Sequence, residues 1–396
     1  MTEAPPATLE QQRLRRLRAE LASAPFDALL LTQPANVQYA GGYRSVGAAV
    51  HGIAAVAAVV TADELLLVGP VADSAPAFDA GLPEGDFVAY GRFYFESPDG
   101  RATATGLVDQ HADLAAAALT AVRRLGLAHA RLGIDTDPQG GAVTSALTDA
   151  LPGLRVGDAG GWMSTVRAVK LPGEVAILER SARAAEDGIV RAIAAARPGS
   201  TERELAAIVA HTMVESGLEP RFVVVTSGPR SALADAFATD RPIARGDLVR
   251  FDVGGTLDGY WSDIGRTAVV GPPGDRQRRF YDAILRGEQA ELDLAAPGVP
   301  ASEVFRRAVE VVTAEGGPAP YRRQHCGHGI GLTTYEPPIV RPGDDGLLRP
   351  GMVFCFETPY YEVGWGGMMV EDTLVVTEDG CRMLTGRARG LTEVPA

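Results

Sequence analysis

The chain has 396 residues, of which 46% are hydrophobic and 22% charged, as in an ordinary globular protein with room for two domains. Its formal net charge of −13 argues against nucleic acid as a partner, because binding to phosphates requires a basic surface. The longest apolar run, residues 53–60, is too short to cross a bilayer, and no signal peptide is evident. Three scattered cysteines fit a reducing compartment, so we expect a cytoplasmic protein with no membrane partner.

The first part of the chain, residues 8–160, alternates helical and strand-like segments. Leu14, Leu17 and Leu21 have helical spacing, and apolar runs typical of strands follow. This alternation predicts an α/β domain, and we find no cluster of chemistry-bearing residues in it. The glycine-rich stretch 157–161 indicates a domain boundary.

The second part contains an internal duplication. Two Pro-Gly turns end at Gly199 and Gly298, and two helical stretches end at Gly217 and Gly316, so both pairs share an offset of 99 residues. The offset becomes 105 at two hairpin-like stretches further on. We therefore predict two related units of helix, turn, helix and hairpin. We expect them to pack face to face, with helices on the outer sheet faces and the hairpins meeting at a pseudo-symmetry axis.

Each hairpin-like stretch carries two acids in similar places. Asp252 and Glu357 each follow a glycine by six residues, and Asp263 and Glu371 each follow a glycine by four residues on the return arm. The arms are rich in β-branched and aromatic residues, which are typical of strands. Four buried carboxylates would be costly without a partner, and a pair of divalent metal ions is the natural one.

Such a site needs a nitrogen ligand to resemble known dinuclear hydrolytic centres. Among the six histidines, His328 lies in a glycine-flanked segment, residues 324–331, where a ligand can approach a metal closely. An oxygen-rich site with a single imidazole favours Mn²⁺ or Fe²⁺ over structural Zn²⁺. We see no nucleophilic-serine elbow, Walker loop or dinucleotide fingerprint.

The successive motifs resemble those of the creatinase/prolidase/aminopeptidase P superfamily. They are Phe251-Asp-Val-Gly, Gly259-Tyr-Trp-Ser-Asp-Ile-Gly-Arg-Thr267, Gly327-His-Gly-Ile-Gly331, Glu357-Thr-Pro359 and Val370-Glu-Asp-Thr373. The resemblance implies an α+β protein. A creatinase/prolidase-like N-terminal α/β domain would span residues 1–163, and a pita-bread catalytic metallohydrolase domain of two related halves would span residues 164–396. It also implies a homodimer and a small-molecule or short-peptide substrate.

The same resemblance implies roles for single residues. Two divalent metal ions would be bound, with Mn²⁺ favoured and Fe²⁺, Co²⁺ or Zn²⁺ as alternatives. Asp252 would bind one metal, Asp263 and Glu371 would bridge both, and His328 and Glu357 would complete the second. Glu357 also resembles the family's catalytic, proton-handling carboxylate.

Three positions depart from the proline-specific members, which normally carry histidines there. This chain has Asp235, Gln324 and Tyr335 instead. The missing histidines resemble hydrogen-bond donors to the tetrahedral intermediate. Tyr335 keeps a donor, whereas Asp235 could hold a cationic group of the substrate when ionised or act as a donor when protonated. We therefore predict catalytic roles for Asp235 and Tyr335.

Three further residues are candidate substrate contacts. His325 could replace a missing histidine, although a packed or solvated histidine is the alternative. Trp365 lies in the turn between two predicted ligands and could line the substrate pocket or pack against a partner subunit. Arg44 resembles a residue of the N-domain loop that reaches a neighbouring active site in dimers, and a surface arginine is the alternative.

The sequence thus predicts a dinuclear metal-dependent hydrolase of C–N bonds, namely an Xaa-Pro dipeptidase or aminopeptidase P-like enzyme. The absent histidines favour one alternative, a creatinase-like hydrolase of a small non-peptide amide or amidine. A second alternative is a binding protein that retains the metal without catalysis.

Overall fold

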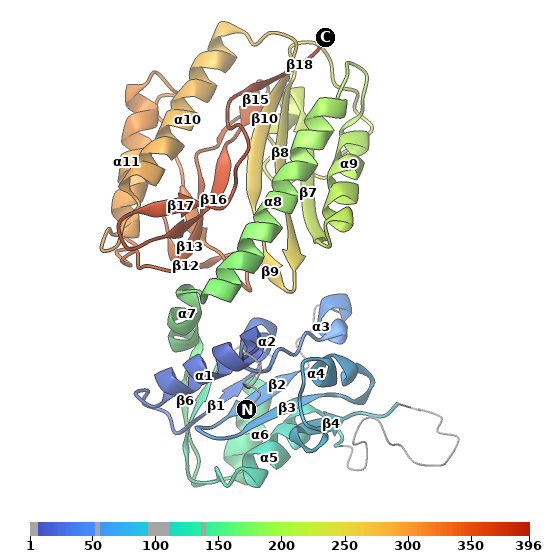
Figure 1. The fold of residues 1–396 in the computed structure, drawn as a ribbon, viewed down its shortest axis with the longest axis vertical. Helices are drawn as coiled ribbons and strands as arrows, with labels where there is room; N and C mark the ends of the chain where they lie inside the picture. The colour runs from blue at the N-terminus through green and yellow to red at the C-terminus, as the bar shows by residue number, and fades with distance from the viewer. Residues whose placement is uncertain (1–6, 52–55, 94–110, 136–139) are drawn as a thin grey trace, which may run out of the picture. The chain divides into compact units, whose positions relative to one another are not determined.

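The computed structural model describes residues 7–51, 56–93, 111–135 and 140–396, and it divides into two compact units, Met1–Val166 and Arg167–Ala396. The two units are described separately (Figure 1). The predicted domain limit at 163/164 falls inside helix α7 (Gly160–Ala168) and stays a prediction. Within the described residues, every helix is too short or too polar to traverse a lipid bilayer.

Unit 1 is built on a six-stranded mixed sheet with the strand order β4-β3-β2-β1-β5-β6. Helices α5 and α6 cover one face, where Ala117 and Leu147 pack against Leu30 and Leu132 of the strands. The predicted α/β domain is therefore confirmed; part of the predicted strand 53–60 lies outside the described residues. The elements are α1 (Leu9–Leu21), β1 (Ala28–Leu31), α2 (Pro34–Gly41), α3 (Val46–His51), β2 (Ala57–Val60), β3 (Leu65–Pro70), η1 (Val71–Asp73), α4 (Ala75–Asp79), η2 (Glu84–Asp86), β4 (Phe87–Tyr90), α5 (Leu114–Arg124), β5 (Arg131–Ile134), α6 (Gly140–Ala150), β6 (Arg155–Asp158) and α7.

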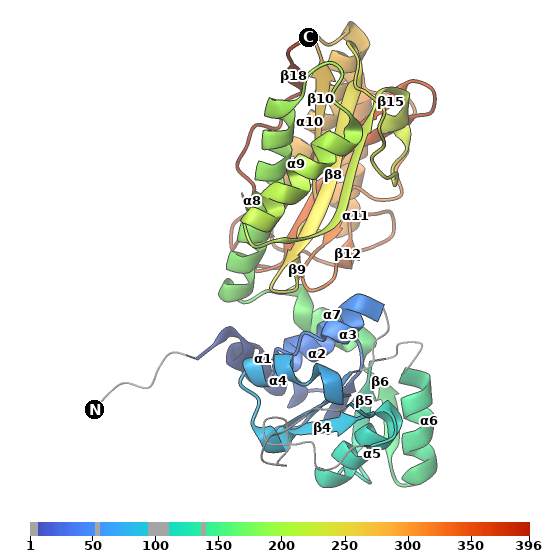
Figure 2. The same cartoon turned by 90° about the vertical axis from the view of Figure 1, so that its right-hand side faces the viewer.

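Unit 2 is built on a larger sheet whose central strands follow the order β12-β11-β13-β16-β10-β8-β7. Helices α8 and α9 lie along the β7–β10 side, and α10 and α11 lie along the β13–β16 side (Figures 1 and 2). The elements are α8 (Pro172–Ala195), α9 (Glu202–Glu215), β7 (Glu219–Ser227), η3 (Gly228–Ala232), β8 (Leu248–Leu257), β9 (Tyr260–Trp261), β10 (Ile264–Val270), α10 (Asp275–Leu294), α11 (Ala301–Ala314), β11 (Gly327–Gly329), β12 (Glu336–Ile339), β13 (Val353–Glu357), β14 (Tyr360–Glu362), β15 (Gly366–Met368), β16 (Glu371–Val376), β17 (Cys381–Met383) and β18 (Thr392–Val394).

The predicted duplication is confirmed by the strand order of unit 2. Strands β7, β8 and β10 of the first half are mirrored by β11, β13 and β16 of the second half. The backbone repeats as well, because Gly246 and Gly351, which are 105 residues apart, both adopt a left-handed conformation, with φ of 87° and 84°. Glycine adopts such angles at little cost, so each turn enters its hairpin in the same way.

The expected face-to-face packing of the two halves is wrong. Strands β10 and β16 are antiparallel neighbours, so the halves join edge to edge in one continuous sheet. A row of paired residues crosses this seam: Asp252 lies opposite Gly265, Gly265 opposite Glu371, and Glu371 opposite Glu357. Residues paired in this way point to the same face of the sheet. The pairing register therefore places the three acids on one face.

Candidate metal centre

All five predicted metal ligands lie on the same face of the unit 2 sheet. His328 on β11 is paired with Cys355, which shares its face with Glu357 two residues later. Asp263 directly precedes β10 and lies two residues before Gly265, which belongs to the row of paired residues. Each half thus supplies part of the set, and the seam between β10 and β16 unites them.

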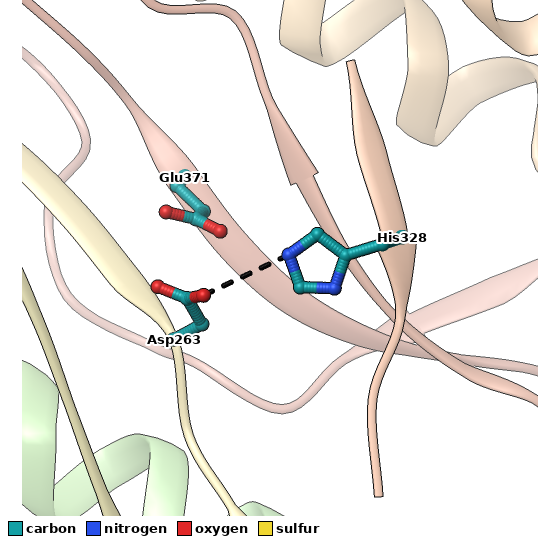
Figure 3. A group of neighbouring side chains, drawn as sticks. All are labelled: Asp263, His328 and Glu371. Carbon is teal, nitrogen blue, oxygen red and sulfur yellow. Dashed lines mark ion pairs between the residues drawn. The ribbon is translucent and has the colours of Figure 1, made fainter. Parts of the chain in front are cut away.

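The tightest group within this set is formed by Asp263, His328 and Glu371 (Figure 3). One ligand atom of each lies within 4.8 Å of the others, and all three side chains are buried. The Nε2 atom of His328 faces Asp263 Oδ2 at 3.7 Å. This spacing suits a cation held between the three side chains.

His328 is oriented as a metal ligand. Its Nδ1 atom lies 3.0 Å from the carbonyl oxygen of Gly329, which can only accept, so Nδ1 carries the proton and Nε2 keeps its lone pair. Burial lowers the pKa of His328, which keeps the imidazole neutral. The side chain of Tyr335 stacks on the ring, with centroids 3.8 Å apart.

The acids of the centre repel one another in the absence of a cation. Burial, followed by the charges of neighbouring acids, raises the pKa values of Asp263 and Glu371 well above their ordinary range. Burial likewise raises the pKa of Asp252, to about 6, although Arg250 opposes the shift. A divalent cation would relieve this repulsion, and the donor set of four carboxylates and one imidazole fits such a cation.

Glu357 differs from the other acids because two basic side chains lie against its carboxylate. Arg323 Nη2 lies 3.3 Å from its Oε2 atom, and His325 Nδ1 lies 3.0 Å from its Oε1 atom. Burial acts to raise the pKa of Glu357, but these two neighbours outweigh it and lower the pKa below its ordinary value. Glu357 is therefore ionised and able to accept a proton at neutral pH.

Two of the predicted accessory residues lie beside this centre. His325 contacts Glu357, and its ring meets that of Tyr335 edge to face at a centroid distance of 5.7 Å. Tyr335 is 54% exposed, so it is open to a ligand on one side while it covers His328 on the other. Their catalytic and substrate-binding roles stay predictions.

The other two predicted substrate contacts are placed differently. Trp365 packs against Phe280 of α10, with ring centroids 5.9 Å apart, and against the guanidinium of Arg276 at 4.3 Å. These contacts favour packing of the turn over substrate binding. Arg44 lies between α2 and α3 of unit 1, and its role at a neighbouring site stays a prediction.

Sequence reasoning gave no role to two arginines that reach the centre. Arg250 Nη1 lies 2.9 Å from Asp252 Oδ2, and Arg323 contacts Glu357 as described above. Both guanidinium groups lie near the ring of Tyr361, at 5.3 and 5.9 Å from its centroid. The sequence did contain a signal for Arg250, which lies two residues before Asp252 in an otherwise apolar strand. Residues two apart on a strand point to the same face of the sheet, so Arg250 could have been placed beside Asp252.

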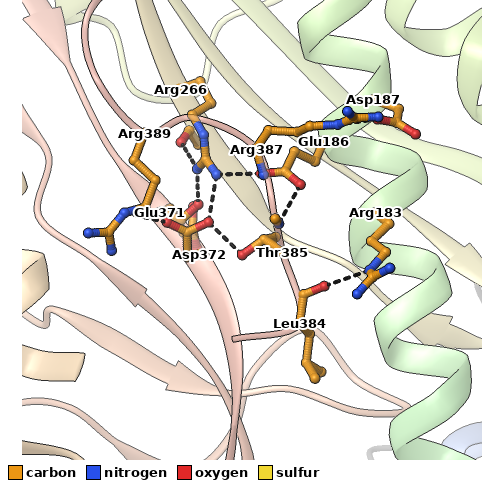
Figure 4. A network of polar contacts seen from close by, with 12 residues as sticks. Arg183, Glu186, Asp187, Arg266, Glu371, Asp372, Leu384, Thr385, Arg387 and Arg389 are labelled. Atoms are coloured by element: carbon orange, nitrogen blue, oxygen red, sulfur yellow. Dashed lines mark hydrogen bonds and ion pairs between the residues drawn. The ribbon is translucent and has the colours of Figure 1, made fainter. Parts of the chain in front are cut away.

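The opposite face of the seam is held by a buried ion network (Figure 4). Arg266 donates to the backbone oxygen of Glu371 at 2.6 Å, to Asp372 Oδ1 at 2.6 Å and to Glu186 Oε1 of α8 at 2.7 Å. Thr385 also donates to Asp372. Arg266, Asp372 and Glu186 are each at most 4% exposed. The network therefore holds strand β16, which carries Glu371, from the sheet face opposite the metal centre.

A second buried network supports the segment that carries Tyr335. Glu336 Oε1 accepts from Arg167 Nη2 at 2.5 Å, and Oε2 accepts from Lys170 Nζ at 3.0 Å. Burial alone would raise the pKa of Glu336, but Lys170 and Arg167 outweigh it and lower the pKa to about 2. Glu336 also accepts from the backbone nitrogen of Thr333, so the network orders residues 333–336.

Replacement of Glu336 by glutamine should lower the free energy of unfolding at pH 7 by on the order of 3 kcal/mol, as its lowered pKa implies. The folded-state pKa lies below the ordinary value, so this stabilisation is present above the ordinary pKa and disappears as the pH falls towards 2. Urea unfolding of both proteins between pH 7 and pH 3 measures the difference. A difference in unfolding free energy that stays constant between pH 7 and pH 3 would contradict the lowered pKa of Glu336.

Comparison with known proteins places these features in a family. The family model for metallopeptidase family M24 matches residues 176–378, and the model for the creatinase/prolidase N-terminal domain matches residues 13–169. The Xaa-Pro dipeptidase of Pyrococcus furiosus is 38% identical over 228 residues, which are 57% of this chain and 65% of that protein. The chain thus spans just under two thirds of that relative's length.

Two mycobacterial proteins extend the likeness. The "Probable dipeptidase PepE" of Mycobacterium tuberculosis is 35% identical over 269 residues, which are 65% of this chain and 72% of that protein. The crystal structure of dipeptidase PepE from Mycobacterium ulcerans superposes with a TM-score of 0.79 at 30% identity, covering 98% of both chains. The chain therefore belongs to metallopeptidase family M24, with a creatinase/prolidase N-terminal domain ahead of the peptidase domain.

Proposed function

We propose that the protein is a dinuclear metal-dependent dipeptidase that hydrolyses the bond before proline in short Xaa-Pro peptides. The observation that carries the proposal is the buried group of Asp263, His328 and Glu371, whose ligand atoms lie within 4.8 Å of one another. Asp252 and Glu357 flank this group in the sheet register. The likeness to an Xaa-Pro dipeptidase supports the choice of substrate.

The residues of the centre have different proposed roles in metal binding and proton transfer. Asp252, Asp263, His328, Glu357 and Glu371 would hold two divalent cations, which when bound supply a Lewis acid and lower the pKa of water. Glu357, kept ionised by Arg323 and His325, would take up a proton and return it to the leaving nitrogen. Mn²⁺ is the metal that the donor set favours, and a cytoplasmic homodimer stays our expectation.

Tyr335 would donate a hydrogen bond to the developing oxyanion. Burial, with the charges of Glu357 and Asp263, raises the pKa of Tyr335, so its hydroxyl stays protonated at neutral pH. The phenol stands where the proline-specific relatives have a histidine. It keeps the donor that the reaction needs.

The Tyr335→Phe variant tests this role, because phenylalanine keeps the stack on His328 but removes the hydroxyl. We expect kcat to fall by roughly 100-fold, the usual effect of losing one oxyanion donor. Steady-state kinetics on an Xaa-Pro dipeptide measures the change, and Mn²⁺ binding should stay as in the wild type. An unchanged kcat would show that only the ring matters.

The proposed function itself is tested by a metal titration combined with a substrate screen. Metal-free protein is titrated with Mn²⁺ in a calorimeter, and the loaded protein is offered Xaa-Pro dipeptides, longer Xaa-Pro peptides and creatine. Two bound ions per chain with cleavage of dipeptides supports the proposal. Turnover of creatine alone would favour a creatinase-like enzyme, and bound metal without turnover of any compound would favour a binding protein.

A further inference from the structure

Arg250 is a fully buried arginine near the start of strand β8, and each guanidinium nitrogen has a partner. Its Nε atom donates to the carbonyl oxygen of Ser231 at 3.2 Å. Its Nη2 atom donates to the carbonyl oxygens of Leu233 and Ala234 at 2.8 and 2.5 Å. Its Nη1 atom donates to Asp252 at 2.9 Å. A buried guanidinium is tolerated only with such complete pairing.

This single group joins a loop to the metal centre. The carbonyl oxygens that it binds belong to the segment 231–234, which begins in the last turn of η3, and the carboxylate that it binds belongs to a predicted metal ligand. Asp235 follows Ala234 directly, so the guanidinium holds the backbone of Asp235 close to Asp252. In agreement with this placement, the charge of Asp235 contributes to the raised pKa of Asp252.

The side chain of Asp235 is exposed, unlike those of the predicted ligands, so it is open to a substrate. An ionised carboxylate can only accept hydrogen bonds, and it attracts a cation. An Xaa-Pro dipeptide always carries one cationic group near its scissile bond, which is the free α-ammonium of the first residue. The chemistry of Asp235 fits that group.

We propose that Arg250 is a positioning residue that sets substrate specificity: it fixes the segment 231–235 onto Asp252, and Asp235 thereby binds the free α-ammonium group of a dipeptide. This inference rests on the proposed function and narrows the substrate class to Xaa-Pro peptides with a free amino terminus.

The test compares alanyl-proline with propionyl-proline, which lacks only the amino group. Wild-type protein loaded with Mn²⁺ should prefer alanyl-proline in kcat/KM by roughly 10- to 100-fold, the range expected for a hydrogen bond between charged groups. The Asp235→Asn and Arg250→Met variants should each lose most of this preference. The double variant should lose no more than either single variant, because both changes remove the same contact.

A second measurement separates positioning from a general loss of structure. Hydrogen exchange of the peptide covering residues 231–237 in metal-free protein should become faster in Arg250→Met and stay unchanged in Asp235→Asn. Arg250→Lys keeps the charge but cannot reach every partner, so it should give an intermediate exchange rate and preference. The matched control is Arg203→Met, a change in an exposed ion pair with Asp240, which should alter neither quantity.

The outcomes distinguish this inference from the proposed function. A wild-type protein that hydrolyses neither compound would overturn the proposed function. A wild-type protein that hydrolyses alanyl-proline, with a preference that survives Asp235→Asn, would overturn the inference alone. Unchanged exchange of residues 231–237 in both Arg250 variants would overturn the positioning role.

Discussion

The Glu371→Gln variant is expected to bind only one of the two metal ions and to lose nearly all hydrolytic activity. Glu371 belongs to the tightest group of ligand atoms, and an amide is a far weaker ligand for a hard cation than a carboxylate. A catalytic metal supplies several kcal/mol of transition-state stabilisation, so kcat/KM should fall by at least about 1,000-fold. Calorimetric titration with Mn²⁺ and steady-state kinetics on alanyl-proline measure the two effects.

The same variant should be more stable than the wild type when metal is absent. In the folded state burial and neighbouring acids raise the pKa of Glu371, so the wild-type acid costs stability as the pH rises above its ordinary pKa. Glutamine removes that charge. Thermal unfolding at pH 8 in EDTA should therefore favour the variant, and added Mn²⁺ should reverse the order.

The matched control for both measurements is Asp258→Asn. Asp258 lies in the turn of the first hairpin, is 59% exposed in its side chain and pairs with Arg180. Its replacement should leave metal binding and activity unchanged. Two Mn²⁺ ions bound per chain of Glu371→Gln with wild-type affinity would refute the assignment of the centre.

The Arg266→Met variant is expected to lose both folding stability and affinity for Mn²⁺. The change removes the cation that Asp372 and Glu186 share and leaves Asp372 with only the longer contact to Arg389 Nε at 3.8 Å. Breaking a buried ion pair from one side costs about 3–5 kcal/mol. It also removes the hydrogen bond to the backbone oxygen of Glu371. Mn²⁺ affinity should therefore fall by roughly 10- to 100-fold, which is the usual effect of removing a residue that orients a metal ligand. Urea unfolding and calorimetry measure the two losses.

Arg387→Met serves as the control for this prediction. Arg387 pairs with Asp187 at the surface, with 57% of its side chain exposed, so its loss should leave the urea midpoint of unfolding nearly unchanged. If Arg266→Met weakened unfolding stability but left Mn²⁺ affinity at the wild-type value, the network would support the fold without orienting Glu371.

Much of the architecture of unit 2 could be predicted from sequence because it is a repeat. Gly246 and Gly351 mark the same turn in each half, and the acids recur at fixed distances from such glycines. The face-to-face arrangement was predicted wrongly because hydrophobic pattern and turn spacing do not specify which strand edges pair. That choice is made by long-range contacts between β10 and β16.

The supporting charges of the site were harder to predict for the same reason. Arg266 and Arg323 meet their acidic partners across strands or loops, and nothing in the local sequence gives those distances, whereas Arg250 lies on the same strand as its partner Asp252. A buried arginine cannot be told from an exposed one by composition alone, since long cationic side chains are usually solvated. For Trp365 the sequence left pocket lining and packing of the turn both open, and the structure adds its contacts with α10 while its role in substrate binding stays a prediction.

The division of ligands between the halves has a consequence for how the protein matures. Asp252 and Asp263 come from the first repeat, whereas His328, Glu357 and Glu371 come from the second. A nascent chain that contains only the first repeat has two of the five proposed metal ligands, which are too few to bind two cations. If these residues hold the cations as proposed, ion uptake follows the synthesis of the second repeat and the pairing of its edge strand β16 with β10.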